Sequence, residues 1–464
     1  MKERGLRPGD RVAILLENSP EYIAAYYGAL MAGGVAVALN TAAKARDLAN
    51  WLTHSGASWL IADALHPELG EISGAANLKL SLIYVGGAAP MVKDAAGWDD
   101  IIGNVVHLPD PLCAFAQDAV AAIIYTSGTT GRPKGVTLSH RNLVSNVDSI
   151  LAYLELTCED RCLNVLPFYY SYGASVLHTH LAVGATLVLE GSMVYVHNVM
   201  TQMQTERITG FYGVPSTYAL ILSRTKLSNY NLSSLRYMTQ AGGAMPPTRV
   251  KRLREELPQV LFFVMYGQTE ATARLAYLPP AMLEQKFGSA GIPIPDVRLE
   301  IRDTQGNQVP RGTTGEIYAC GPNIMAGYWN DPEATSEVIR NGWLKTGDIA
   351  YMDEDGYIFI QGRESDIIKS GGHRINPNDI EEAIAELAGV SEVVVVGVND
   401  EILGQTIKAI IVPRPGASVD AMAIKAHCLR RLPAYKVPKY IEFNTELPRT
   451  ASGKVRRFLL ASKN

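Results

Sequence analysis

The chain has 464 residues, of which 47% are hydrophobic and 19% are charged, a composition typical of a globular protein with more than one domain. Its formal net charge of -4 leaves no basic footprint for nucleic acid or for an anionic membrane surface. The 5 cysteines are scattered and contain no C-x-x-C pair, so neither a disulfide framework nor a zinc site is indicated. We therefore expect a cytoplasmic protein that binds no nucleic acid.

The segment from Tyr22 to Ala43 is uncharged and has the length of a membrane-spanning helix. Gly33 and Gly34 divide it into YIAAYYGALMA, which has helical composition, and VAVALN, which has the β-branched composition of a strand. We expect a helix, a turn and a buried strand here, and no integral membrane segment.

Up to about residue 288, short apolar stretches alternate with helical ones. The stretches that we interpret as strands include RVAILLEN, VAVALN, SWLIAD, AVAAIIYTS, CLNVLPF, ITGFYGVP and VLFFVMYGQTE. Strands that are apolar on both faces and separated by helices predict parallel sheets covered by helices on both sides. The predicted fold class is therefore α/β.

The pattern changes after this region, and it predicts the domain organisation. Residues 289–362 contain VRLEIRDTQGNQV and IAYMDEDGYIFIQG, two predicted hairpins, the second closing at Asp355 and Gly356. We expect a large N-terminal domain over residues 1–362, with a β-rich subdomain at about 289–362. Residues 363–366 are the predicted hinge, and residues 367–464 a small, mobile α+β C-terminal domain.

The stretch YTSGTTGRPKGV, Tyr125 to Val136, carries three glycines, four Ser or Thr residues and one lysine after an apolar strand. It does not match the nucleotide loop G-x-x-x-x-G-K-[ST], because Pro133 stands at the second glycine and Gly135 at the final hydroxyl. Backbone N–H groups, hydroxyls and Lys134 can still surround a phosphate. An ordinary surface turn has a similar composition.

Other stretches are ambiguous when taken one at a time. YGQTE, Tyr266 to Glu270, follows a buried strand at the end where α/β sheets bind ligands, and it offers an aromatic ring and a carboxylate. The TGD stretch that ends at Asp348 can accept hydrogen bonds from a ribose, or it can be a plain turn. The glycines after Ala241 can let a ligand lie against the backbone, or they can allow a close strand–helix crossing. Lys454 has the setting of a solvated tail lysine.

Taken together, these stretches resemble one family. YTSGTTGRPKGV, YGQTE, NGWLKTGD, the GR of GRESD and PRTASGK occur in the order and approximate spacing of the adenylate-forming enzymes, which include acyl-CoA synthetases, firefly luciferase and nonribosomal-peptide adenylation domains. The resemblance implies that a carboxylic acid attacks the α-phosphate of ATP, and that a thiol then displaces AMP from the acyl adenylate. It also implies ATP, Mg²⁺ and coenzyme A, or a carrier-protein phosphopantetheine arm in place of coenzyme A.

The resemblance also assigns site residues. The β- and γ-phosphates would be held by Thr126, Ser127, Gly128, Thr129, Thr130, Gly131 and Lys134. Tyr266 would stack on adenine, and the nucleotide would also contact Gly242, Gly243, Gly267, Gln268 and Thr269. Glu270 would bind Mg²⁺ at the α-phosphate, and Asp348 with Arg363 would bind the ribose. Lys454 would bridge the substrate carboxylate and the α-phosphate.

The second half-reaction involves the small domain. In the family this domain swings between the two steps, which would bring Gly371, Gly372 and His373 to the thiol channel, with Lys369 as a further catalytic candidate. Ser365 occupies the hinge position where relatives carry Asp or Lys. The chain also begins close to GDRVAIL, where relatives have a further N-terminal segment, so we expect either a truncated start or a compact member.

The acyl pocket is predicted from PFYYSYG and GFYGVPS, which match the family's pocket segments and carry no charge. The residues expected to line it are Tyr170, Tyr172, Phe211, Tyr212 and Gly213. Amino-acid-activating relatives place an Asp in the neighbourhood of Tyr169 and Tyr170, and a buried ammonium without a carboxylate is costly, so an uncharged acid is favoured. Fatty and aryl acids are the main candidates, and short branched acids are also left open.

The predicted function is thus an AMP-forming acid–thiol ligase, similar to acyl-CoA synthetases, that acts on a small carboxylic acid. The alternatives are an adenylation enzyme that loads an acyl carrier protein, a luciferase-like mono-oxygenase, a non-catalytic adenylate-binding protein, and a kinase or GTPase with ADP or phosphate as product. A homodimer is also left open.

Overall fold

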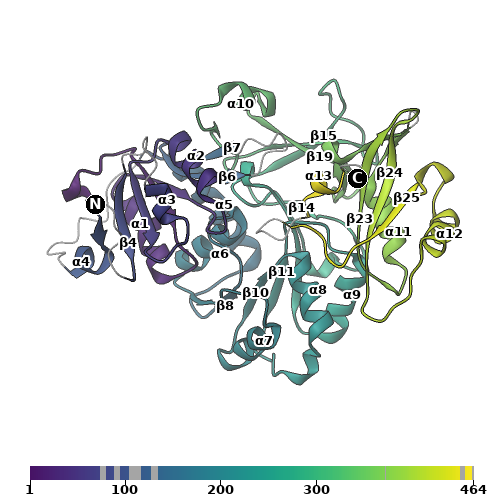
Figure 1. Cartoon of the computed structure of the whole chain (residues 1–464), viewed down its shortest axis with the longest axis horizontal. Helices are drawn as coiled ribbons and strands as arrows, with labels where there is room; N and C mark the ends of the chain where they lie inside the picture. The colour runs from purple at the N-terminus through teal and green to yellow at the C-terminus, as the bar shows by residue number, and fades with distance from the viewer. Residues whose placement is uncertain are drawn as a thin grey trace.

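The computed structural model describes residues 1–73, 80–87, 95–103, 116–126, 134–370, 373–449 and 455–461. It is a mixed α/β structure with four sheets. Three of them form a large N-terminal domain, and the fourth forms a small C-terminal domain, in yellow and yellow-green at the right of Figure 1. The predicted fold class is confirmed.

The first sheet has the strand order β17-β7-β6-β2-β1-β3-β4-β5. Its strands are β1 Arg11–Leu15, β2 Val35–Ala38, β3 Trp59–Asp63, β4 Ser81–Val85, β5 Ala96–Gly97, β6 Val120–Thr126, β7 Lys134–Ser139 and β17 Gly327–Tyr328. The helices in this part of the chain are α1 Pro20–Met31, α2 Ala45–Ser55, α3 Leu69–Ser73, α4 Trp98–Gly103 and α5 His140–Leu154, with the 3-10 turn η1 Lys2–Arg4. Helix α1 and strand β2 confirm the helix, turn and strand predicted between Tyr22 and Ala43. No helix among the described residues is both long enough and apolar enough to span a bilayer.

The glycine-rich stretch joins β6 to β7, and these two strands are antiparallel. A nucleotide loop of the kinase type instead connects a strand to a helix. The topology therefore excludes that kind of loop, in agreement with the spacing of Gly128, Pro133 and Gly135.

The second sheet has the order β14-β13-β12-β11-β10-β8-β9. Its strands are β8 Arg161–Asn164, β9 Thr186–Leu189, β10 Gly210–Gly213, β11 Tyr237–Gln240, β12 Leu261–Tyr266, β13 Ala276–Leu278 and β14 Ile292–Pro293. Its helices are α6 Ser171–Ala182, α7 Val196–Thr205, α8 Pro215–Arg224 and α9 Pro247–Glu256, with the 3-10 turns η2 Leu227–Asn229, η3 Thr269–Ala271 and η4 Pro280–Met282. Strands β8 to β12 are parallel, and all of them except the edge strand β9 are largely buried, whereas β13 and β14 are antiparallel. Both large sheets thus differ from the parallel expectation at one edge, where antiparallel strands are added.

The remaining sheets confirm the β-rich and α+β regions. The third contains β15 Arg298–Arg302, β16 Gly315–Cys320, β18 Ile339–Arg340, β19 Trp343–Met352 and β20 Ile358–Arg363, with helix α10 Pro332–Val338 and the turn η5 Glu364–Asp366. The fourth contains β21 Ile368–Ser370, β22 His373–Ile375, β23 Val390–Asp400, β24 Gly404–Pro413 and β25 Tyr440–Phe443, with α11 Pro377–Ala385, α12 Ala421–Arg431, α13 Arg457–Leu460 and η6 Ala434–Lys436. Strands β19 and β20 form the hairpin predicted to close at Asp355 and Gly356, and Gly356 has a φ of 90°, a value that glycine adopts readily.

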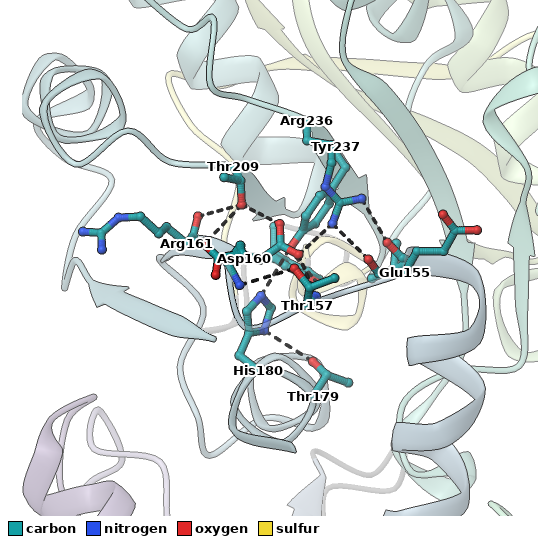
Figure 2. A network of polar contacts seen from close by, with 12 residues as sticks. Glu155, Thr157, Asp160, Arg161, Thr179, His180, Thr209, Arg236 and Tyr237 are labelled. Carbon is teal, nitrogen blue, oxygen red and sulfur yellow. Dashed lines mark hydrogen bonds and ion pairs between the residues drawn. The ribbon is translucent and has the colours of Figure 1, made fainter. Parts of the chain in front are cut away.

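Polar contacts fasten the amino-terminal edge of the second sheet (Figure 2). Asp160, Thr209 and Arg236 directly precede β8, β10 and β11, which are neighbouring parallel strands. The buried Asp160 carboxylate accepts hydrogen bonds from the Thr209 hydroxyl at 2.7 Å and from Arg236 Nη2 at 2.9 Å. Side-chain hydrogen bonds therefore occupy the amino-terminal edge of this sheet. The opposite, carboxyl-terminal edge is where ligands bind in α/β sheets.

We expect Asp160→Asn to lower the free energy of unfolding by about 1–3 kcal/mol, because Arg236 loses its carboxylate partner. Burial alone would raise the pKa of Asp160, but hydrogen bonds from Thr209, the Thr157 amide and Arg236 outweigh burial and lower it. A folded pKa below the unfolded value means that this stabilisation is present above the unfolded pKa and is lost as the pH falls through the folded one. Urea denaturation at several pH values measures both effects.

The matched control is Asp118→Asn, which also breaks an aspartate–arginine pair. The Asp118 side chain is 76% exposed, against 5% for Asp160, so we expect a much smaller loss, because an exposed pair is screened by solvent. Equal losses in the two variants would contradict the proposed importance of the Asp160 network.

Candidate functional site

The site lies where neighbouring parallel strands of the second sheet end. Gly213 on β10 is directly opposite Gln240 on β11, and Gln240 is opposite Val264 on β12. The loops that follow these strands therefore leave the sheet at the same edge, and two of them carry Gly242 and the YGQTE stretch. Segments far apart in the chain meet here, as expected for an α/β ligand site.

Tyr266, Asp348 and Arg363 form one connected group. The Tyr266 hydroxyl donates to Asp348 Oδ2 at 2.6 Å, and Arg363 Nε lies 3.0 Å from Asp348 Oδ1. The ion pair follows from strand register, because Asp348 on β19 is directly opposite Arg363 on β20. The Asp348 carboxylate raises the pKa of Arg363, and burial together with Asp348 raises the pKa of Tyr266. The structure thus joins three residues that the sequence placed in three separate motifs.

Glu270 has a partner that the sequence did not reveal. The Tyr328 hydroxyl donates to Glu270 Oε1 at 3.0 Å, and Lys134 Nζ lies 4.7 Å from the centre of the Tyr328 ring. Tyr328 reaches this place because the two-residue strand β17 pairs with β7. No motif in the sequence could have signalled so short a strand.

Glu270 fits a hard divalent cation. It supplies one carboxylate, and the described part of the chain contains no cluster of three or more His, Cys, Asp or Glu side chains that could bind a metal on its own. Mg²⁺ commonly binds in this manner, through one or two carboxylates with water and substrate phosphates as its other ligands. When bound, it would neutralise charge on the phosphates.

The YGQTE loop also has features of a ligand site. Gln268 Nε2 is buried and has no hydrogen-bond partner in the structure. An added Cβ at Gly267 would meet the Ala273 carbonyl oxygen at 1.9 Å, so only glycine fits at that position. The free buried donor of Gln268 is available to a bound molecule. In the neighbouring loop, the Gly243 carbonyl accepts from Gln240 Nε2 at 2.6 Å, and Gly242 has a φ of 85°.

The predicted acyl-pocket residues separate into groups. Tyr172 lies with Tyr212 and Gly213: its hydroxyl is 3.5 Å from the Gly213 carbonyl oxygen, and the two tyrosine rings are 6.2 Å apart at their centres. Phe211 packs on the other face of β10, against α7 and α8, because neighbouring residues of a strand face opposite sides. Tyr170 faces the first sheet and accepts from Asn40 Nδ2 at 3.4 Å. Phe211 and Tyr170 are therefore not brought together with Tyr172.

A charged residue missed by the sequence analysis lies beside Tyr172. Arg274 is 1% exposed, and its guanidinium carbon is 4.2 Å from the centre of the Tyr172 ring. The two predicted pocket segments carry no charge themselves, but the residues packed on them include this arginine.

The small domain carries two of the predicted residues on the β21–β22 hairpin. The Lys369 amide donates to Gln405 Oε1 at 2.8 Å, and the His373 ring stacks on Tyr435 with 4.1 Å between centres. Ser365 lies in the turn η5. Outside the described residues lie Ser127, Gly128, Thr129, Thr130, Gly131, Gly371, Gly372 and Lys454, whereas Thr126 ends β6.

Comparison with known proteins decides which family this arrangement represents. The family model described as AMP-binding enzyme matches residues 1–329, and the model described as AMP-binding enzyme C-terminal domain matches residues 379–454. The chain belongs to the AMP-binding enzyme family. It is 37% identical to a feruloyl-CoA synthase from Amycolatopsis sp over 98% of this chain and 89% of that protein.

Two further relatives support the assignment of this AMP-binding enzyme. A long-chain-fatty-acid–CoA ligase from Bacillus subtilis is 34% identical over 98% of this chain and 85% of its own length. An o-succinylbenzoate CoA synthetase from Bacillus subtilis, solved with its acyl-adenylate intermediate, superposes with a TM-score of 0.86 at 30% identity, covering 100% of this chain and 90% of that one. The chain is an AMP-forming acid–CoA ligase of the acyl-CoA synthetase type.

Proposed function

We propose that this ligase activates an aryl carboxylic acid with ATP and Mg²⁺ and transfers the acyl group to coenzyme A. The proposed binding of ATP is supported mainly by one observation. Tyr266, Asp348 and Arg363 come from distant segments and form one hydrogen-bonded group. A carboxylate beside a cation and a phenol is suited to accept hydrogen bonds from the two ribose hydroxyls. Lys134 and Glu270 are joined through Tyr328, and they would hold the phosphates and Mg²⁺.

The remaining roles rest on the resemblance. Lys454 would bridge the reacting carboxylate and the α-phosphate, where a flexible cation offsets the repulsion of two anions. The two family matches support the proposed division of the chain, because they fall on either side of the hinge. The division is a large domain over residues 1–362, a hinge at 363–366 and a small domain over 367–464. Four cysteines within the described residues are free thiols, which supports a reducing, cytoplasmic setting.

The aryl class is favoured by the surroundings of Tyr172. Its ring is edge-on to Tyr212, and both rings belong to one buried cluster with Tyr153 and Phe263, so the half-buried Tyr172 ring has aromatic surroundings that favour a flat aromatic ligand. Feruloyl and o-succinylbenzoyl, the groups in the names of two of the compared relatives, are also aromatic. No aspartate stands at Tyr169 or Tyr170, so an amino acid is disfavoured.

Pyrophosphate release with a panel of acids tests the proposal. We expect benzoates and cinnamates to give AMP and pyrophosphate with coenzyme A present, and ATP–pyrophosphate exchange without it, at higher kcat/KM than fatty acids of similar size. ADP as product would contradict the ligase, and a preference for fatty acids would contradict the aryl class. A parallel assay with a phosphopantetheine-loaded carrier protein decides between the two thiol acceptors.

A further inference from the structure

Arg274 is a buried cation that the reaction described above does not use. It has the largest side chain among the residues that are almost fully buried. Its Nε donates to the sulfur of Met265 at 3.3 Å, and its guanidinium lies over the Tyr172 ring. Nη2 is buried and has no hydrogen-bond partner. One strong donor of this guanidinium is therefore unsatisfied by the protein.

The charge of Arg274 is also uncompensated. Arg236, Arg363 and Arg457 each form an ion pair with a carboxylate, at 2.9, 3.0 and 2.6 Å. Within the described ranges Arg274 forms none, and the titratable side chains that sense its charge are Tyr153 and Tyr172, which burial keeps neutral by raising the pKa of each. The face of an aromatic ring attracts a guanidinium, but less strongly than a carboxylate does. A buried cation left in this state favours an anionic or strongly accepting ligand.

Arg274 packs against the predicted acyl-pocket segment through Tyr172. The Tyr172 ring that it covers belongs to the segment matched to the family's acyl pocket, and the preceding residue, Ser171, has its hydroxyl 3.1 Å from that of Thr269 beside the proposed phosphate position. One short segment therefore contacts the reacting end through Ser171 and the unpaired cation through Tyr172. An acid bound between them would present its far end to the guanidinium.

We propose that Arg274 is a specificity-determining residue that selects acids carrying an oxygen acceptor at the end remote from the reacting carboxylate. A second carboxylate gives the largest gain, because the free Nη2 would donate a charge-assisted hydrogen bond to it, and an ether or phenol oxygen gives a smaller one. The inference rests on the proposed function and narrows its substrate class. It departs from the expectation of an uncharged acid, which considered only the two pocket segments.

The test compares benzoates and cinnamates that differ only in the para group: methyl, methoxy or carboxylate. In the wild-type enzyme we expect kcat/KM for pyrophosphate release to be at least about 10-fold higher with carboxylate than with methyl, and intermediate with methoxy. In Arg274→Met this order should be lost or reversed, while the methyl-substituted acids still turn over. The change should appear mainly in KM, because the contact is made equally in the ground and transition states.

The control variant is Arg254→Met. It removes an arginine whose partner, Glu284, is 80% exposed on the surface, and it should leave the ratios unchanged. Arg274→Lys keeps the positive charge but lacks the guanidinium N–H donors, so it should reduce the preference for the para-carboxylate. This variant tests the inference even if Arg274→Met does not fold. Equal ratios in the wild type and the variants, or a wild type that prefers methyl, would overturn the inference. Turnover of the methyl acids separates this failure from failure of the ligase itself, in which no acid gives AMP.

Discussion

Glu270→Gln is expected to lower the rate of adenylate formation by about 100-fold or more. Glutamine keeps the size of the side chain and can still accept the Tyr328 hydrogen bond, now 3.0 Å long, so the fold should be preserved. It removes the negative charge that would hold Mg²⁺ against the phosphates, and amide oxygen is a weaker ligand for this hard cation. ATP–pyrophosphate exchange at several Mg²⁺ concentrations measures the loss, and the variant should need more Mg²⁺ for half-maximal rate.

Glu284→Gln is the matched control. This glutamate is 80% exposed and pairs with Arg254, so the same chemical change there should leave exchange at the wild-type rate. A Glu270→Gln enzyme with an unchanged rate and an unchanged Mg²⁺ requirement would remove Glu270 from the metal site. A variant that binds the acid normally but fails in exchange would support the role.

The convergence of Tyr266, Asp348 and Arg363 follows from short motifs at the ends of strands. Tyr266 ends a buried strand, and the carboxyl ends of parallel strands meet at one edge. Asp348 and Arg363 lie on the two strands of a hairpin whose turn residues were recognised, and the register then places them opposite each other. In these cases local sequence determines the geometry.

The residues that were missed depend on contacts between distant segments. Tyr328 reaches Glu270 through a strand of two residues, which has no periodicity to detect. Arg274 was missed because arginine is normally exposed, and only the packing of Tyr172 and Met265 around it shows that it is buried. The antiparallel edges of the two large sheets were missed for the same reason, since apolar composition identifies a strand but not its partner.

The neighbouring aromatic residues of β10 show a limit of a different kind. The family resemblance marks Phe211 and Tyr212 equally as expected pocket residues, yet strand alternation allows only one of them to face Tyr172. Which one does so is decided by the register of β10 against β8 and β11. A match to the family's pocket segment alone assigns both.

Asp348→Ala is expected to raise the KM for ATP by more than about 100-fold, because it removes the acceptor of two charge-assisted hydrogen bonds, each contributing about 1.5–3 kcal/mol. Its partner Arg363 is 45% exposed and can be hydrated after the change, whereas the buried Tyr266 hydroxyl loses its acceptor. A moderate loss of stability should therefore accompany the larger loss in nucleotide binding. Asp355→Ala, at the exposed turn of the same hairpin, should leave the KM unchanged.

The sharper measurement of the role of Asp348 uses 2′-deoxy-ATP. If Asp348 binds the ribose, the wild-type enzyme should discriminate against the deoxynucleotide and Asp348→Ala should not, since the hydroxyl has then lost its acceptor. Equal discrimination in both enzymes would assign Asp348 to holding Tyr266 and Arg363 in place instead.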